Sequence, residues 1–342
     1  MTKAKKKLIT IPRLIILALL ILVMIMGAWL GIRTLLVNAL VGNIKALEIE
    51  GYEVGHGGLT MAGFPFTVIA SSTNISVRAP SSVLPDPVKN WSIKADRLKL
   101  RSPTISPLSW DLQHSGNLRI DMRGPQGERY MFDIAPANID ARAAVSMKGS
   151  LKSATFTMSR AQIDALIGTP PVVTMLDNLS AEIKVSANTA KLSLHSNDIR
   201  LSPKIPGPLD NILGRKLELV ELNADLENWS QLEQGGAQNW IENGGRVRAD
   251  HWAMLWGPAD MVGDFDISFK NGLPEGVINI RIKKPGSLID TITDTGLIEK
   301  KQARQAKGFL SLIETGEDNR KSIQITIKDG IVKYGFVPLY EF

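Results

Sequence analysis

The residues that could perform catalysis are few and lie far apart in the sequence. The chain has no cysteine, which excludes disulfides, thiolate catalysis and cysteine-ligated metals. No pair among its four histidines has metal-ligand spacing: His56, His114, His195 and His251. No nucleophile elbow, phosphate-binding loop or dinucleotide fingerprint occurs. We therefore expect no catalytic residue, no cofactor and no metal site. An enzyme built from carboxylates of distant segments, such as a glycan hydrolase, remains an alternative.

One segment, Trp240 to Gly276, is rich in large apolar side chains and contains three of the seven tryptophans. A core filled by large rings is one interpretation of this segment. The other is an apolar groove that takes a lipid chain or a partner strand. The expected groove residues are Phe64, Phe66, Trp240, Trp252, Trp256, Phe265, Ile267, Phe269, Ile278, Ile280 and Ile282.

Most of the chain beyond Gly51 alternates apolar and polar residues with a period of two. The clearest runs are Arg97–Arg101, Leu118–Arg123, Asp264–Lys270, Ile278–Lys283 and Ile323–Asp329. Successive side chains of a strand point to opposite faces, so each run has one apolar and one hydrated side. This pattern predicts about a dozen or more strands in a large, mainly antiparallel, curved sheet. A phase change between Leu219 and Val220 predicts a bulge or bend.

Three segments interrupt this pattern and predict short helices. They are Ser159–Gly168, Gly235–Gly245, and Leu288–Glu314 with breaks near Gly296 and Gly308. Turn-forming residues at Asn271–Gly276 and Lys328–Gly330 predict hairpins. Strand runs with a nearby helix occur in both Gly149–Arg200 and Lys216–Lys284, so the domain forms either one continuous layer or two similar halves.

The motif Gly63-Phe64-Pro65-Phe66 follows shortly after the N-terminal apolar region. Proline cannot donate a hydrogen bond to a ladder, so Pro65 predicts a sheet edge or a strand end. Gly63 and the Gly57-Gly58 pair are expected to form the surrounding turns. We expect Phe64 and Phe66 to share the apolar face.

The N-terminus has the pattern of a membrane anchor. Residues 14–32 contain no charge, and Leu14–Gly31 alone would form a helix about 27 Å long. A cleavable signal peptide is the rival interpretation, but its apolar core would be shorter and would end in a small-residue cleavage site. The apolar spacing predicts that the helix continues as an amphipathic stalk over residues 33–50. Residues 51–342 would then form the β-rich domain.

The net charge of +6 arises almost wholly before this span, where five basic residues lie: Lys3, Lys5, Lys6, Lys7 and Arg13. The positive-inside rule places residues 1–13 in the cytoplasm and the domain outside, which in a bacterium is the periplasm. The rest of the chain is near neutral, which is not the pattern of a nucleic-acid binder. We expect a single-pass protein of the inner membrane.

Three motifs resemble the DUF2125 family, alphaproteobacterial proteins of unknown function. They are the Gly63–Phe66 motif soon after an anchor, the pattern Leu255–Gly276, and the C-terminal run "IKDGIVKYGFVPL". The resemblance implies an envelope location and no catalytic residues. More loosely, the architecture resembles AsmA-type and lipopolysaccharide-transport proteins, whose curved sheets shelter acyl chains. That likeness is an architectural analogy.

Two functions follow as expectations. The first is a membrane-anchored periplasmic protein that binds or shields lipid or another apolar ligand, because so many one-sided strands expose more apolar surface than a few short helices can cover. The alternative is an envelope scaffold or assembly factor that binds a protein partner, for example by adding a strand at a sheet edge.

Overall fold

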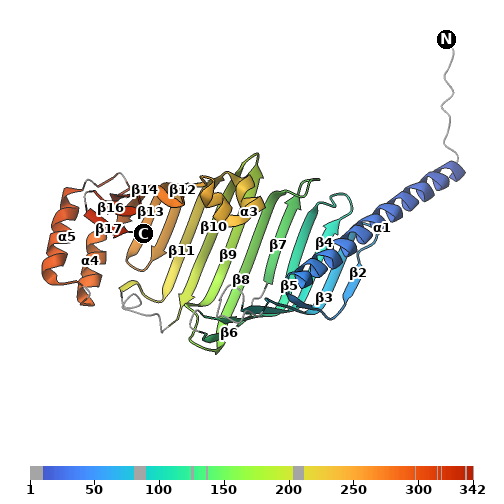
Figure 1. The fold of residues 1–342 in the computed structure, drawn as a ribbon, viewed down its shortest axis with the longest axis horizontal. Helices are drawn as coiled ribbons and strands as arrows, with labels where there is room; N and C mark the ends of the chain where they lie inside the picture. Colours follow the sequence, from blue (N-terminus) through green and yellow to red (C-terminus); the bar gives the residue numbers. More distant parts are fainter. Residues whose placement is uncertain are drawn as a thin grey trace, which may run out of the picture.

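The protein is a long, curved antiparallel sheet with one N-terminal helix projecting from one end (Figure 1). The computed structural model describes residues 11–80, 90–124, 127–135, 138–202, 212–296, 298–313, 315–316, 318–335 and 337–341. The basic residues expected in the cytoplasm at positions 3, 5, 6 and 7 lie outside these ranges. All seventeen described strands belong to a single sheet. The prediction of a mainly β protein with one large curved antiparallel sheet is therefore confirmed.

The first nine strands form the half of the sheet next to the N-terminal helix. They are β1 (Glu53–Gly55), β2 (Leu59–Ala62), β3 (Thr67–Arg78), β4 (Trp91–Pro103), β5 (Ser109–Arg123), β6 (Arg129–Ala135), β7 (Asn138–Val145), β8 (Leu151–Ile167) and β9 (Val173–Ser186). Strands β1 and β2 share one edge along β3, and β6 and β7 together fill the space between β5 and β8.

The remaining strands continue as an uninterrupted antiparallel meander to the other edge. They are β10 (Thr189–Leu201), β11 (Lys216–Glu227), β12 (Arg246–Trp256), β13 (Ala259–Lys270), β14 (Leu273–Lys283), β15 (Arg320–Lys328), β16 (Ile331–Tyr334) and β17 (Val337–Glu341). Both predicted hairpins are present: Asn271-Gly272 joins β13 to β14, and Asp329-Gly330 joins β15 to β16. All four of these residues have positive φ, which this tight type of turn requires.

Helix α1 (Ile11–Ile49) runs without a break through the expected span and stalk, and then packs on the sheet. Its segment Leu20–Ile49 is long and apolar enough to span a membrane, with a mean hydropathy of 2.2. The side chains that meet the sheet recur every three or four residues: Trp29, Ile32, Leu36 and Leu40. Leu36 is buried against Val68 and Ala70 of β3. The C-terminal part of α1 is therefore a packing element of the domain.

A line of irregular residues crosses the sheet and bends it. On β8, β9 and β10 successive residues of one face of the sheet are spaced by three instead of two, at Met158 and Ala161, Leu176 and Leu179, and Ser196 and Ile199. Arg160 and Asp198, which lie inside these gaps, have positive φ, as does Asn74 in β3. Such irregularities bend strands. Because they lie at the same level on neighbouring strands, we infer that they crease the sheet lengthwise.

One helix prediction was wrong. Residues 159–168, expected to be helical, belong largely to β8. The helical spacing of Ile163, Leu166 and Ile167 suggests one apolar helix face, but all three lie in β8, where Leu166 and Ile167 are 49% and 39% exposed. A bulge is present in β11 as predicted, but its pairing with β12 shifts between Leu217 and Leu219, just before the predicted position between Leu219 and Val220.

Two other predicted helices are present with altered bounds. α3 (Trp229–Glu242) begins six residues before the predicted start and contains a kink at Gly236. α4 (Pro285–Asp294) and α5 (Lys300–Leu312) replace the predicted broken helix. The break near Gly296 is confirmed. The second break was wrong, because Gly308 lies inside α5, where a single glycine costs only about 1 kcal/mol relative to alanine.

The attachment of α1 can be tested with neighbouring leucines. Leu36→Ala should lower the free energy of unfolding by about 2–4 kcal/mol, because Leu36 is 4% exposed and its removal leaves a cavity against β3. Leu35, which is 71% exposed, provides the matched control Leu35→Ala. Denaturant unfolding of detergent-solubilised protein would measure both. Equal effects of the two substitutions would contradict the packing of α1.

Candidate functional site: an apolar trough

One unbroken row of apolar residues crosses the sheet from β2 to β15. The members are paired across adjacent strands: Met61, Ala70, Leu100, Leu112, Ala141, Phe156, Ala181, Leu194, Leu222, Trp252, Gly263, Ile280 and Ile323. Twelve steps between strands give the row a length of about 58 Å at 4.8 Å per strand. We call the face that contains this row the trough.

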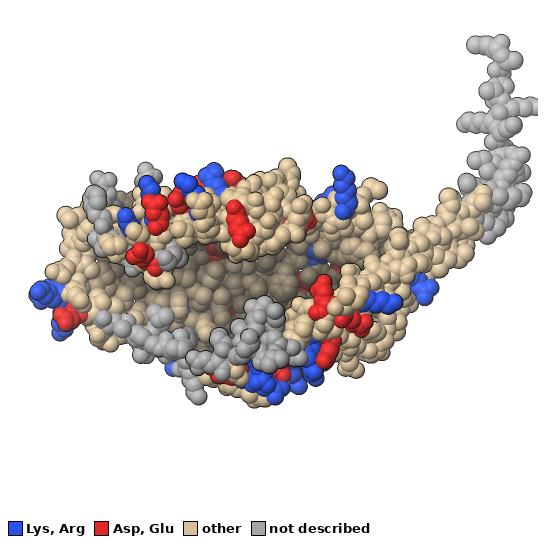
Figure 2. All heavy atoms as spheres, in the orientation of Figure 1, with Lys and Arg blue, Asp and Glu red and all other residues tan. Residues whose placement is uncertain are grey.

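The trough is the hollow side of the molecule. In Figure 1, α1 lies on the near side of the sheet, and α1 contacts Ala70 and Leu100 of the row. Figure 2 shows that this side has a long hollow, lined largely by residues other than Lys, Arg, Asp and Glu. In the middle of the row, Phe156, Leu194 and Leu222 are only partly buried. Large side chains in a closed core would be buried, so the trough is an open apolar surface.

Small residues dominate the tightly buried positions of the sheet. Among the described residues, ten of the eighteen buried hydrophobic side chains are alanines, such as Ala161, Ala190 and Ala249. Alanine has little surface to bury, so the main driving force for folding comes from larger side chains that remain partly accessible. This arrangement is unusual for a closed hydrophobic core. It fits an exposed apolar surface that a second apolar molecule covers.

Helices lie against both ends of the trough. The C-terminal half of α1 packs on its first strands, at Val68 and Ala70. At the other end, α4 and α5 pack over β14–β16 and leave a recess of about 310 Å³ lined by aliphatic and aromatic side chains. Phe309 of α5 stacks edge-on against Tyr334 of β16 at a ring distance of 5.6 Å. Ile280 and Ile323 of the row lie on the same face as the recess residues Ile282 and Ile325, so the apolar track continues under α4 and α5.

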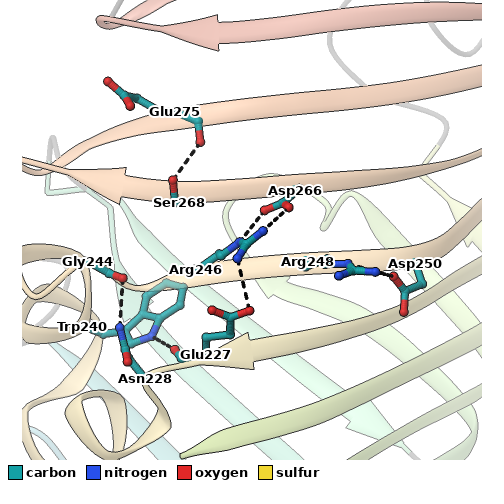
Figure 3. Close-up of polar contacts among 10 residues, drawn as sticks. All are labelled: Glu227, Asn228, Trp240, Gly244, Arg246, Arg248, Asp250, Asp266, Ser268 and Glu275. Atoms are coloured by element: carbon teal, nitrogen blue, oxygen red, sulfur yellow. Dashed lines mark hydrogen bonds and ion pairs between the residues drawn. The ribbon is translucent and has the colours of Figure 1, made fainter.

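The opposite face of the sheet is covered by ion pairs between neighbouring strands. Arg129 binds Asp121 at 2.6 Å, and Arg119 binds Asp133 at 3.2 Å. Near α3, the Arg246 guanidinium lies between Asp266 and Glu227, forming a bidentate hydrogen-bonded pair with Asp266 (Figure 3). Cross-strand charge pairs of this kind hold the register of a sheet whose outer face is in water.

Contacts near the Arg246–Asp266 ion pair fix α3 to the rim of the sheet, where β11 ends and β12 begins. The Trp240 indole donates a hydrogen bond to the Glu227 carbonyl at 2.6 Å, and the Asn228 amide donates to the Gly244 carbonyl (Figure 3). The Trp240 ring also stacks edge-on against Phe269 at 5.5 Å. Trp240 is 7% exposed. It therefore anchors α3, and the sequence interpretation of a packed ring applies to this residue.

Eight of the eleven expected groove residues lie together on the trough face. Strand register places Trp252 opposite Gly263, Phe265 opposite Ile278, and Gly263 opposite Ile280. The alternation along β12, β13 and β14 puts the remaining members on the same side: Trp256, Ile267, Phe269 and Ile282. The Trp252 ring lies over Gly263, because a Cβ there would come within 2.6 Å of the indole nitrogen.

The other expected groove residues lie elsewhere. Trp240 belongs to α3 and is buried against Phe269, as described above. Phe64 and Phe66 lie in the turn between β2 and β3 at the opposite end of the sheet, not on a strand face as expected. Phe64 packs edge-on against Trp29 of α1 at 5.6 Å. The prediction that Pro65 marks a strand end at a sheet edge is confirmed.

The middle of the trough was not predicted from the sequence. Phe156, Leu194 and Leu222 were not among the expected groove residues, because the predicted groove followed the tryptophan-rich segment that forms β12–β14. The alternation in β10 and β11 contained the signal, since Leu192 and Leu194, and likewise Leu222 and Ala224, share a face. Only the strand order shows that these short runs join into one surface.

The structure brings no catalytic constellation together in its described part. His195 and His251 flank Glu221 on the outer face, at 2.9 and 3.6 Å from its carboxylate oxygens. His114 lies on the trough face, buried, with no hydrogen-bond partner for either ring nitrogen. Within the described ranges, no group of three or more acidic or histidine side chains could hold a metal ion.

These features define a class of protein: an open β-sheet trough with an apolar interior, attached to a helix long enough to span a membrane. The chain belongs to the DUF2125 family, described as uncharacterized proteins conserved in bacteria, whose profile matches residues 29–342. The resemblance noted in the sequence is thereby confirmed. The match begins at Trp29, where α1 first meets the sheet. No curated protein and no solved structure matched the chain.

Gly263 offers a test of how closely the trough floor is packed. A Cβ at this position would lie 2.0 Å from the Asn279 carbonyl oxygen and would also meet the Trp252 ring. Gly263→Val should therefore lower the free energy of unfolding by about 1–3 kcal/mol. Gly286→Ala is the control, since its Cβ would meet nothing within 4 Å. Unchanged unfolding of Gly263→Val would show that the two strands can separate at this point.

The Arg246–Asp266 pair predicts a specific loss of stability in acid. The Arg246 guanidinium lowers the pKa of Asp266 below its ordinary value of 3.8. A lowered pKa in the folded state stabilises the fold above the unfolded pKa, and this contribution disappears as the pH falls through the folded pKa. Asp266→Asn should cost about 0.5–1 kcal/mol at neutral pH, because the pair is well exposed.

The difference between Asp266→Asn and the unmodified protein should shrink as the pH falls from about 5 to 3. Thermal unfolding over that pH range would measure it. Asp250→Asn is the matched control, since the Arg248–Asp250 pair joins two residues of one strand and is more exposed. A pH-independent difference for Asp266→Asn would contradict the role of this ion pair.

Proposed function

We propose that this protein is anchored by α1 in the bacterial inner membrane and uses its trough to bind or shield the hydrocarbon of a lipid in the periplasm. The observation that supports the proposal most directly is the unbroken apolar row from Met61 to Ile323. A surface of this length, left partly open, is costly in water unless an apolar partner covers it. The basic N-terminal residues and the apolar span support the orientation.

Hydrocarbon suits the trough better than an extended peptide does. The trough floor is the face of a sheet, and the backbone donors and acceptors of its inner strands are already used in the ladders between neighbours. A peptide lying on this face would find few partners for its own amides, at a cost of about 1–3 kcal/mol for each unpaired group. An acyl chain has no such groups to satisfy.

The absence of a catalytic constellation in the described part of the chain agrees with a binding role. The partly exposed rings of Phe156, Trp252 and Phe265 provide broad apolar contacts without the convergent polar groups that position a substrate for reaction. We therefore propose binding or transfer of an intact lipid rather than its chemical conversion.

The trough can be blocked with a charge pair on two facing strands. Leu194 and Leu222 are cross-strand partners at the middle of the row. The double variant Leu194→Glu/Leu222→Lys should retain the fold through the new ion pair and lose most of the co-purifying lipid. Native mass spectrometry after gentle detergent extraction, together with lipid extraction, would measure the loss.

The matched control is Ser193→Glu/Asn223→Lys, which places the same charges on the same two strands but on the outer face. This control should keep the lipid. Absence of lipid from the unmodified protein in repeated gentle preparations would overturn the proposal, as would equal retention by both double variants.

A second function is favoured by one observation: within the described residues, the sheet ends at β1–β2 on one side and at β17 on the other. Either edge could accept a strand from another envelope protein, as a scaffold would. In-cell crosslinking from β2 separates the two functions. A single stoichiometric protein partner, combined with no lipid in the trough, would favour the scaffold.

A further inference from the structure

The turn between β2 and β3 packs against α1 near the C-terminal end of the helix's apolar run. The Trp29 indole donates a hydrogen bond to the Thr67 carbonyl at 2.7 Å, and its ring packs edge-on against Phe64 at 5.6 Å. The Arg33 guanidinium lies 5.8 Å from the centre of the same indole. These contacts fix the position of the Gly63–Phe66 turn along the helix axis.

The apolar run of α1 extends to Ile32, and the charged Arg33 follows it. Trp29 is thus three residues, or about 5 Å along the helix, inside the end of the uncharged run. Only residues 14–28 of that run lie beyond the sheet contact, and they span about 22 Å, which is less than the roughly 30 Å thickness of a bilayer's hydrocarbon core. A bilayer that covers the whole apolar run must therefore reach the level of the turn.

The side chains at this level suit a membrane surface. Phe66 is 72% exposed and Phe64 is 47% exposed. Thr104, in the turn between β4 and β5, donates a backbone hydrogen bond to the Phe66 carbonyl at 2.9 Å. This contact brings Ile105, which is 95% exposed, next to the first turn. Two neighbouring turns thus expose four large apolar side chains near the expected membrane helix, the fourth being Leu108 at 37%.

We propose that these two turns, Gly63–Phe66 and Thr104–Leu108, insert into the outer leaflet of the same bilayer that α1 crosses. The proposal rests on the membrane anchoring proposed above and deepens it. The partner is the lipid surface itself, because α1 keeps these turns permanently at that surface. Aromatic side chains are favoured in this interfacial region, and Trp29 with Phe64 and Phe66 supplies three.

The insertion would join the trough to its source of ligand. Met61 and Ala70, the first two residues of the apolar row, lie a few residues to either side of the Gly63–Phe66 turn. Leu36 and Leu40 of α1 pack beside them and extend the apolar surface. A lipid of the outer leaflet could pass from the bilayer along α1 into the trough while remaining in contact with apolar side chains. The proposed ligand is therefore a membrane lipid of that leaflet.

The absence of native cysteine allows a direct test. Single-cysteine variants Phe66→Cys and Ile105→Cys of the full chain would be labelled with the environment-sensitive dye NBD. The protein would be reconstituted in phosphatidylethanolamine–phosphatidylglycerol vesicles, with and without phosphatidylcholine carrying a doxyl quencher near the headgroup end of its acyl chain. Both sites are exposed, so the substitutions should leave the fold intact.

The matched controls are Val172→Cys and Leu312→Cys, which are also exposed, at 59% and 80%. Val172 lies between β8 and β9 on the opposite rim of the sheet, and Leu312 ends α5 at the far end. The proposal expects several-fold stronger quenching and a shift to shorter emission wavelength at positions 66 and 105 than at the controls. Equal quenching at all four positions, or none at 66 and 105, would overturn it.

The two proposals can fail separately. Lipid content would be measured on the same preparations by mass spectrometry. Lipid bound in the trough without quenching at position 66 would overturn the insertion and leave the binding function standing. Quenching at positions 66 and 105 without any trough lipid would support insertion and count against lipid binding.

Discussion

The structure depends on one constraint: strands of a single antiparallel sheet pair in sequence, and the pleat sends alternate side chains to opposite faces. Because each inner strand finds its hydrogen-bond partners in its neighbours, the sheet grows to seventeen strands without needing a second layer. One face then collects ion pairs such as Arg129–Asp121, and the other collects the apolar row. The protein therefore has a stable backbone scaffold and an apolar face that its own helices cover only in part.

The three helical elements differ in what they do for this face. α1 covers the first strands of this face through Leu36 and Leu40. α4 and α5 cover the last strands of the face at Ile323 and Ile325. α3 lies at the rim, held by the Trp240 indole and by Asn228. The middle of the trough, around Leu194 and Leu222, remains partly accessible. This distribution of cover supports a ligand that lies along the sheet with both ends protected.

The crease in the sheet connects local conformation to the proposed function. Arg160 and Asp198 adopt positive φ, which costs energy for residues with a side chain. Aligned irregularities on adjacent strands are repaid by a bend that brings the two rims toward each other, which gives the sheet its trough shape. The family to which the chain belongs is uncharacterized, so function must be argued from this shape and its surface chemistry.

The sequence by itself determined the fold class, the long apolar N-terminal helix and most of the inward-facing residues of β12–β14. Periodicity of two and of three or four residues is local. A run such as Phe265–Phe269 therefore shows by itself which of its residues share a face. The sequence did not determine the end of β8, because Ile163, Leu166 and Ile167 have helical spacing although they lie in a strand. It also misplaced Phe64 and Phe66, which lie in a turn.

Only the tertiary structure decided which strands pair and where the helices pack on the sheet. The row from Met61 to Ile323 exists because thirteen strands align in register, and no single run contains that information. The contact between Trp29 and Phe64, which places the first turn beside the apolar part of α1, joins residues 35 positions apart. Cross-strand register and helix docking are set by long-range packing. A local pattern of residues contains no information about such packing.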